Sequence, residues 1–131
     1  MSLRSAAISL ATAAAVALSA SPVQAATASH SSCFLATNWA GWKSPDPNTI
    51  YVRVDFGHVY RFDLAHPSND LDDPSVHLVS KIVGTDWICS PVDLLLYVAD
   101  DRGITREPLF VKSISELTPD EVRAIPAKFR P

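Results

Sequence analysis

The chain has 131 residues, and the first 25 have the character of an export signal, so the remainder has room for one domain and not for two. Without Arg4, the mature chain holds 10 Lys and Arg residues against 14 Asp and Glu residues, a net charge of −4. Proteins that bind nucleic acid need a basic surface, so this balance argues against a nucleic-acid partner. Ten prolines and four glycines argue against a long helical bundle.

Residues 1–25 predict a secretory signal peptide. Arg4 supplies the positive charge, residues 6–18 form an uncharged apolar stretch, and Val23 and Ala25 are the small residues that a signal peptidase reads. Cleavage after Ala25 leaves Ala26 as the new N-terminus, with a second acceptable site about three residues further on. The apolar stretch is shorter than the roughly 20 residues that span a bilayer. We therefore expect export to the periplasm or the cell exterior, with no stable membrane anchor after cleavage.

Two cysteines remain in the mature chain, Cys33 and Cys89. An even pair in a small exported domain favours a disulfide, and the alternatives are free buried thiols or a chemically active pair. No histidine stands at a useful spacing from either cysteine to complete a metal site. Cys33 also follows His30 and stands well beyond the apolar stretch, which argues against a lipid anchor on it.

The mature chain begins with small and polar residues, 26–32, which predict a disordered N-terminal tail. Residues 34–43 predict a first, irregular strand. Residues 44–48 predict a loop, because Pro45 and Pro47 stand two residues apart and proline is excluded from the middle of a sheet.

Residues 49–54 and 59–64 each alternate between apolar and polar side chains. Residues 55–58 fit the connecting turn, in which Gly57 is free to take a positive φ. Two such segments joined by a short turn predict a β-hairpin. Its apolar face consists of Ile50, Val52, Val54, Tyr60, Phe62 and Leu64.

Further strands are predicted at residues 76–83, 92–99 and 108–114. The segment 92–99 is almost entirely apolar and therefore predicts a central strand. A short apolar segment at 87–89 places Cys89 in or beside the core. Residues 65–75 and 100–103 predict a polar loop and a turn.

The C-terminal segment predicts a short helix. Thr118 and Glu121 have the spacing of a capping box, and Pro119 suits the first helical position. The helix ends before Pro126, so Val122 and Ile125 must pack on the sheet to hold it. The predicted fold class is mainly β, a small antiparallel sheet or barrel of five to six strands with one short C-terminal helix, in a single domain at residues 33–131.

Short motifs run in order along the mature chain: Cys33-Phe34, Gly41-Trp42, residues 49–54, 59–64 and 70–72, Trp87 to Ser90 with Asp93, and residues 113–126. In order and spacing they resemble an uncharacterised family of small exported proteobacterial proteins, a domain of unknown function (number six-four-nine-one). The resemblance implies little about activity, because no catalytic residues are established for that family. Relatives often carry two more cysteines, near Ser68 and Leu109, and their joint absence implies the loss of one disulfide that leaves Cys33 and Cys89 as the other. An aromatic residue is usual at position 42, which implies a core role for Trp42.

For the residues that could take part in catalysis or metal binding, structural or surface roles are the favoured interpretations. The four histidines, at positions 30, 58, 66 and 77, have no metal-binding spacing and predict surface side chains. Residues 69–73 are rich in oxygen ligands but lack the glycine and distal glutamate of an EF-hand, so a solvated acidic loop is favoured over weak calcium binding. Asp63 and Asp93 form a carboxylate pair only if their strands are neighbours. A Cys89 thiolate with His58 or His77 as base is the remaining nucleophilic alternative.

Trp39 and Trp42 are the candidate ligand platform, although packing in the core is the favoured role. Their spacing of three does not place both on one face of a regular strand, but a bulge at Gly41 would do so. The sequence therefore predicts a non-enzymatic exported domain, with no catalytic residue, cofactor or metal, that binds an envelope partner through an exposed sheet edge or the polar loops. The alternatives are a small-ligand or glycan binder that uses Trp39 and Trp42 and, less favoured, an enzyme with a dispersed site.

Overall fold

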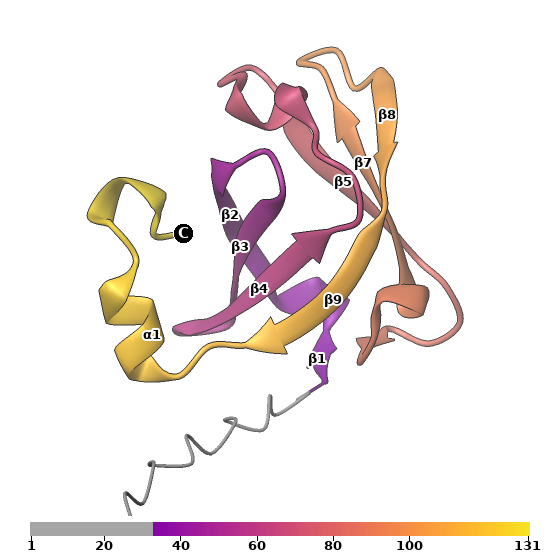
Figure 1. Cartoon of the computed structure of the whole chain (residues 1–131). Coiled ribbons are helices and arrows are strands. Elements are labelled where there is room, and N and C mark those ends of the chain that lie inside the picture. Colours follow the sequence, from indigo (N-terminus) through magenta and orange to yellow (C-terminus); the bar gives the residue numbers. More distant parts are fainter. Residues whose placement is uncertain (1–32) are drawn as a thin grey trace, which may run out of the picture.

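The structure is a computed structural model, and it describes residues 33–131 (Figure 1). The predicted signal peptide, its cleavage site between Ala25 and Ala26, and the predicted tail lie outside the described residues. The described part is mainly β with one helix near the C-terminus, which confirms the predicted fold class. None of its helices has the length and apolar character needed to cross a membrane.

Nine strands, one α-helix and four short 3-10 turns follow one another along this part of the chain. The strands are β1 (Phe34–Leu35), β2 (Trp39–Asp46), β3 (Thr49–Val54), β4 (His58–Leu64), β5 (His77–Ile82), β6 (Trp87–Ile88), β7 (Leu94–Ala99), β8 (Thr105–Leu109) and β9 (Val111–Glu116). The helix is α1 (Pro119–Ala124), and the 3-10 turns are η1 (Ala36–Asn38), η2 (Asn69–Asp72), η3 (Pro91–Asp93) and η4 (Ala127–Phe129).

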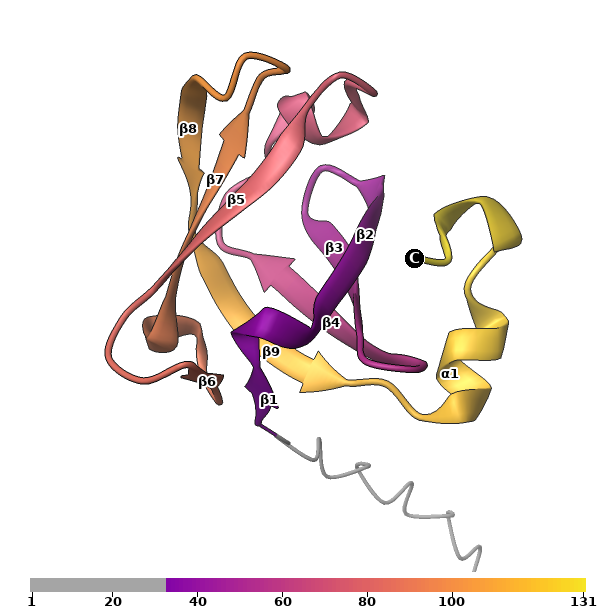
Figure 2. The ribbon, with the colours of Figure 1, turned by 180° about the vertical axis from the view of Figure 1, so that it is seen from behind.

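The strands form three antiparallel sheets within the described residues. Their orders are β2-β3-β4-β9, β5-β7-β8 and the small pair β1-β6. Figure 1 shows β8 running directly into β9, so one bent stretch of chain belongs to both larger sheets. The edge strands are β2 and β9 in the first sheet and β5 and β8 in the second. Seen from behind in Figure 2, β5 and β2 cross the middle of the view and β8 lies at its left. The sheets do not close into a barrel.

The predicted hairpin is confirmed as β3 and β4, paired from Thr49↔Asp63 to Val54↔His58. The turn needs two residues in the left-handed region, Asp55 with φ of 52° and Gly57 with φ of 141°. Asp tolerates this region better than most residues, because its short polar side chain causes little steric conflict. The Asp55 backbone N–H donates to the Asn38 carbonyl at 3.0 Å, which ties the turn to η1.

Several predicted boundaries are wrong. Residues 34–43 are not one strand, because η1 separates β1 from β2 and the two strands belong to different sheets. Residues 44–46 were expected in a loop, but β2 continues through Pro45 to Asp46. This is possible because β2 is an edge strand and its register shifts between Lys43 and Asp46, the two settings in which a sheet accepts proline. The expected strand 108–114 is two strands that break at Phe110, because the chain bends there from one sheet into the other.

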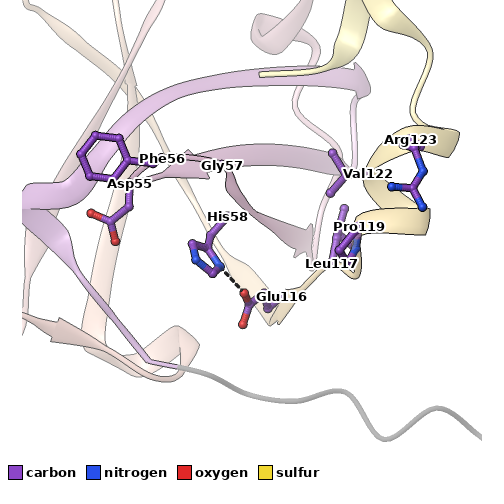
Figure 3. A pocket seen from close by; sticks show the side chains of 9 residues that line it. All are labelled: Asp55, Phe56, Gly57, His58, Glu116, Leu117, Pro119, Val122 and Arg123. Carbon is purple, nitrogen blue, oxygen red and sulfur yellow. Dashed lines mark hydrogen bonds and ion pairs between the residues drawn. The ribbon is translucent and has the colours of Figure 1, made fainter.

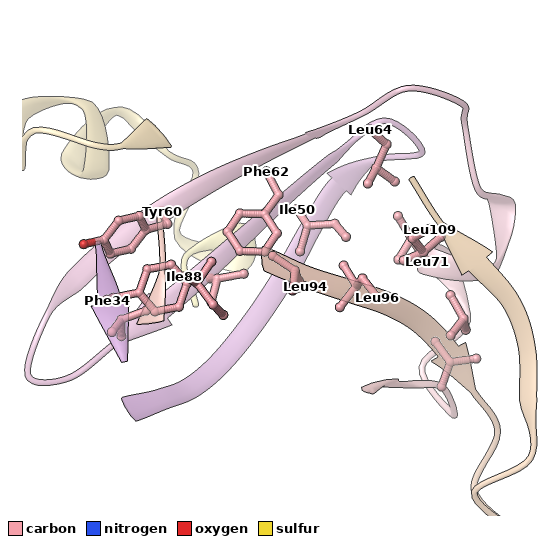
Figure 4. Close-up of a cluster of buried hydrophobic side chains, with 14 residues drawn as sticks. Phe34, Ile50, Tyr60, Phe62, Leu64, Leu71, Ile88, Leu94, Leu96 and Leu109 are labelled. Atoms are coloured by element: carbon pink, nitrogen blue, oxygen red, sulfur yellow. The ribbon is translucent and has the colours of Figure 1, made fainter. Parts of the chain in front are cut away.

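The core lies between the inner faces of the two larger sheets (Figure 4). Ile50 and Phe62 from the first sheet and Leu96 from the second are at most 2% exposed. Phe34 of β1 and Leu71 of η2 add their side chains to the same cluster. Burial of a side chain of this size stabilises the fold by about 1.5–3 kcal/mol.

Helix α1 has the predicted capping box. The Glu121 backbone N–H donates to Thr118 Oγ1 at 3.3 Å, and the Thr118 backbone N–H donates to the Glu121 carboxylate at 2.7 Å. Six residues are too few for a stable isolated helix, so packing must hold it. Ile125 is 5% exposed and Val122 is half-buried, so both side chains contribute to that packing.

Candidate functional site

A groove lies between the β3–β4 turn and helix α1 (Figure 3). Its volume is about 720 Å³. Apolar side chains from the turn and the helix end form most of its wall, and four polar side chains interrupt them. The lining residues are Asp55, Phe56, Gly57, His58, Glu116, Leu117, Pro119, Val122 and Arg123.

His58 and Glu116 form the polar centre of this region. His58 begins β4 and Glu116 ends β9, and the register pairs Glu116 with Tyr60, so His58 lies on the same face as a diagonal neighbour. Their atoms Nδ1 and Oε1 are 2.6 Å apart. His58 is 63% exposed, so water screens the pair and its contribution to stability is small.

A second, smaller cavity lies on the other side of the same pair. Its volume is about 310 Å³, and it shares Asp55, His58 and Glu116 with the groove. Tyr60 and Trp87 are among its other lining residues. It therefore combines aromatic side chains with carboxylate, imidazole and amide groups within one concave surface, which is typical of small-molecule sites.

The predicted disulfide between Cys33 and Cys89 is confirmed. It joins the strands β1 and β6, whose register pairs Phe34 with Ile88 and Leu35 with Trp87. Cys89 is exposed and Ile88 beside it is fully buried, so the core position in this segment belongs to Ile88. Cys33 also lines the second cavity, so the bridge holds one wall of that cavity in place.

Trp39 and Trp42 lie on the same face of β2. A register shift between Trp39 and Gly41 places Trp39 opposite Val54 and Trp42 opposite Val52, and both valines point into the core. The bulge that the sequence required is therefore present, but it turns both indoles inward. Both are half-buried against the core, and neither lines either cavity described above.

The acidic loop at residues 69–73 is engaged in protein contacts. The Arg106 guanidinium lies 3.8 Å from Asp70 and 3.3 Å from Asp73. Asp73 also accepts hydrogen bonds from the hydroxyl and backbone N–H of Ser75, and these lower the pKa of its carboxyl, the hydroxyl most strongly. Among residues 33–131, no group of three or more His, Cys, Asp or Glu side chains is placed to hold a metal ion.

The structure separates Asp63 from Asp93, so they do not form a carboxylate pair. Asp63 accepts a hydrogen bond from Arg61 at 2.7 Å, which raises the pKa of that guanidinium, and another from the Ser113 hydroxyl at 3.0 Å. Asp93 instead caps η3 by accepting from the backbone N–H groups of Cys89 and Ser90. Both carboxylates therefore have structural partners.

The remaining histidines lie apart from one another in the described part of the chain. His66 packs edge-on against Phe110, with ring centroids 6.3 Å apart, and His77 begins the edge strand β5. Neither lines the two cavities, and only His58 does so. The disulfide also leaves Cys89 without a thiolate, which excludes the Cys89 nucleophile.

The outer face of the β5-β7-β8 sheet is a second candidate surface. Leu95 is 49% exposed on β7, and Val83 and Val92 are exposed at the same end of the sheet. Tyr97 follows Leu95 on this face, with the Lys81 ammonium 5.7 Å from its ring centroid. The face is therefore apolar and carries a positive charge.

Sequence reasoning missed Trp87 and the His58–Glu116 pair. Trp87 had a usable signal, because it directly precedes a buried residue in a strand tied down by a disulfide, so alternation turns it outward. The His58–Glu116 pair had no such signal in the sequence, because 58 residues separate its members and only the β4–β9 register brings them together.

Comparison of the chain with protein-family models, curated protein sequences and solved structures finds no match in any of the three.

Proposed function

We propose that this protein is an exported binding domain that holds a partner protein by accepting an extended segment of it along β5. The single observation that carries the proposal is the unpaired edge of β5 beside an apolar sheet face. The predicted signal peptide and the disulfide support an oxidising location outside the cytosol. Membership of the exported family that the sequence resembles is part of the same proposal.

The hydrogen-bond pattern of β5 identifies its outward groups. The Val83 backbone N–H donates to the Asp93 carbonyl at 2.8 Å, which continues the β5–β7 register. Hydrogen-bonded pairs alternate along an antiparallel ladder, so the odd-numbered residues of β5 bond to β7. The N–H and C=O groups of Leu78, Ser80 and Ile82 therefore point to the free edge.

The other edge strands of the larger sheets are β2, β8 and β9, and they are less suited to strand addition. β2 contains Pro45 and β8 contains Pro108, which have no N–H to donate, and η2 and η4 pack against β2 while η3 packs against β9. β5 contains no proline and pairs only with β7 among the described strands. An added strand at β5 would extend a sheet of three strands to four.

The side chains beside this edge define the chemistry of the partner. Val79 of β5 and Val83, which directly follows β5, lie on the outer face of this sheet, next to Tyr97 and Leu95 of β7. A partner strand would cover these with alternate apolar side chains and place a carboxylate near Lys81. The expected occupant is therefore an extended, apolar segment that contains one acidic residue.

Photo-crosslinking in the native envelope tests the proposal. A photoreactive residue at position 83 should form one defined adduct with a second protein, and a residue at position 112 on β9 serves as the control site. Ser80→Pro should abolish the adduct, because it removes an outward N–H while the β7 ladder stays intact. Ser80→Ala, the matched control, should keep it.

The crosslinked segment is then made as a synthetic peptide. Its binding should slow amide hydrogen exchange at Leu78, Ser80 and Ile82 in the wild-type domain and not in a folded Ser80→Pro variant. An adduct with a second copy of this chain alone, or an adduct that survives Ser80→Pro, would refute the proposed function. Absence of any adduct at position 83 would refute it as well.

A further inference from the structure

The smaller cavity beside Trp87 contains polar side chains that the fold itself does not use. Asp55 and Asn38 are joined through the backbone, and no hydrogen bond ties either side chain to another described residue. Both side chains line the cavity. A carboxylate offers two acceptor oxygens and an amide offers both donors and an acceptor, so together they match neighbouring hydroxyl groups of a ligand.

The position of these polar groups is fixed by the backbone. Asp55 is held at φ of 52° in the β3–β4 turn, and its backbone N–H donates to the carbonyl of Asn38 in η1. Figure 3 shows the Asp55 carboxylate on the same side of the hairpin as His58 and Glu116. Nδ1 of His58 lies 2.6 Å from Glu116 Oε1, and a neutral ring that donates through Nδ1 presents Nε2 as an acceptor.

An aromatic surface completes the cavity. Trp87 is 50% exposed although it stands in a paired strand, and its strand partner is Leu35. The disulfide joins the residues at one end of this strand pair, so the backbone that carries the indole is held by a covalent bridge as well as by the ladder. A ligand that stacks on the indole therefore orders only the two side-chain torsions of Trp87 and not the chain around it.

We propose that this cavity binds a neutral saccharide of one or two rings. The ring stacks on Trp87, because the C–H-rich face of a sugar is apolar and suits an indole surface. Its hydroxyl groups bond to Asp55 and Asn38. The volume of about 310 Å³ is at the lower end of ligand pockets, which limits the ligand to this size.

The charges of the cavity exclude an acidic ligand. Asp55 and Glu116 contribute two carboxyl groups, and His58, which is paired with Glu116, is its one imidazole. A sugar acid would bring a third carboxylate into the same space. The site therefore differs from the Trp39 and Trp42 platform expected from the sequence, and it is independent of the strand addition at β5.

The test is titration of the purified, oxidised mature chain with glucose, N-acetylglucosamine, maltose and chitobiose, followed by calorimetry and by NMR of the indole signals. At least one neutral sugar should bind and shift the Trp87 indole resonance, while glucuronate should not bind. Trp87→Ala and Asp55→Asn should each weaken binding by about tenfold or more.

Two controls keep the outcome clear. Phe110→Ala removes an exposed aromatic side chain that does not line the cavity, and it should leave sugar affinity unchanged. Ser80→Pro blocks the β5 edge and should also leave it unchanged, so the two proposals fail separately. If none of the four sugars binds at millimolar concentration, or if folded Trp87→Ala and Asp55→Asn variants bind like the wild type, the saccharide site is refuted.

Discussion

At the scale of single residues, the Asp93 side chain holds together the turn between β6 and β7. Its carboxylate accepts from the backbone N–H groups of Cys89 and Ser90 and lies next to the disulfide. These bonds lower the pKa of the Asp93 carboxyl below its ordinary value of 3.8, with the Cys89 bond as the largest cause. One charged side chain thus orders the turn that follows β6.

This lowered pKa gives a pH-dependent prediction. A carboxyl with a lower pKa in the folded state stabilises the fold above its unfolded value, and this stabilisation is lost as pH falls through the folded value. Asp93→Asn should therefore be less stable than the wild type at pH 7, and the difference should shrink below about pH 4. Urea unfolding from pH 7 to pH 2 measures it, and a constant difference over this range would contradict the prediction.

Two other carboxyls belong to the same acid transition. Hydrogen bonds lower the pKa of Asp100, chiefly the bond from the Ile104 backbone N–H, and that of Asp73, chiefly the bond from the Ser75 hydroxyl. The wild-type domain should therefore lose stability in acid as these groups are protonated together. The Asp93→Asn variant should still lose stability in acid, because only the contribution of the Asp93 carboxyl is removed.

At the scale of elements, the cap of α1 gives a second prediction. Thr118→Ala removes the side-chain oxygen that accepts from Glu121, and it should destabilise the domain by about 1 kcal/mol. Thr118→Ser keeps a hydroxyl at this position and should retain most of the stability. Thermal unfolding of the wild type and the two variants measures the effect. Equal midpoints for all three proteins would show that the cap does not stabilise the domain.

The elements that the sequence predicted well are those with local signals. The hairpin follows from the alternation of Ile50, Val52 and Val54 with a turn that contains Gly57, and both are contained in one short stretch of chain. The helix start follows from Thr118 and Glu121 for the same reason. Local patterns suffice where the deciding contacts are also local.

The features that the sequence did not predict depend on distant contacts. Pro45 is tolerated within β2 because β2 is an edge strand. The order of strands in a sheet cannot be deduced from the alternation of apolar and polar residues in one segment. Phe110 interrupts a predicted strand because its two sides pair with different sheets. The His58–Glu116 pair and the cavity beside Trp87 depend likewise on which strands become neighbours.

At the scale of the whole molecule, the disulfide links two distant parts of the chain and can be removed by substitution of its two cysteines. The bridge closes a loop with a sequence separation of 56 between Cys33 and Cys89. The paired variant Cys33→Ser with Cys89→Ser should lose roughly 4 kcal/mol of unfolding free energy in the chain-entropy description. Denaturant unfolding of this variant and of the oxidised wild type provides the measurement.

Reduction of the wild type is the matched control for that prediction. The reduced wild type and the double serine variant should unfold at similar denaturant concentrations, because both lack the same covalent link. The small β1-β6 pair should loosen first, because each of its strands has two residues. If the double variant unfolds at the same midpoint as the oxidised wild type, the bridge does not stabilise the domain.

The passage of β8 into β9 has a consequence for how the protein unfolds. Leu109 lies in the core opposite Leu96, while two residues later Val111 pairs with Leu64 of the other large sheet. A slip of one position in this shared stretch would invert its inward and outward side chains in both layers at once. We therefore expect the two larger sheets to unfold together, because both depend on the alignment of this one stretch of chain.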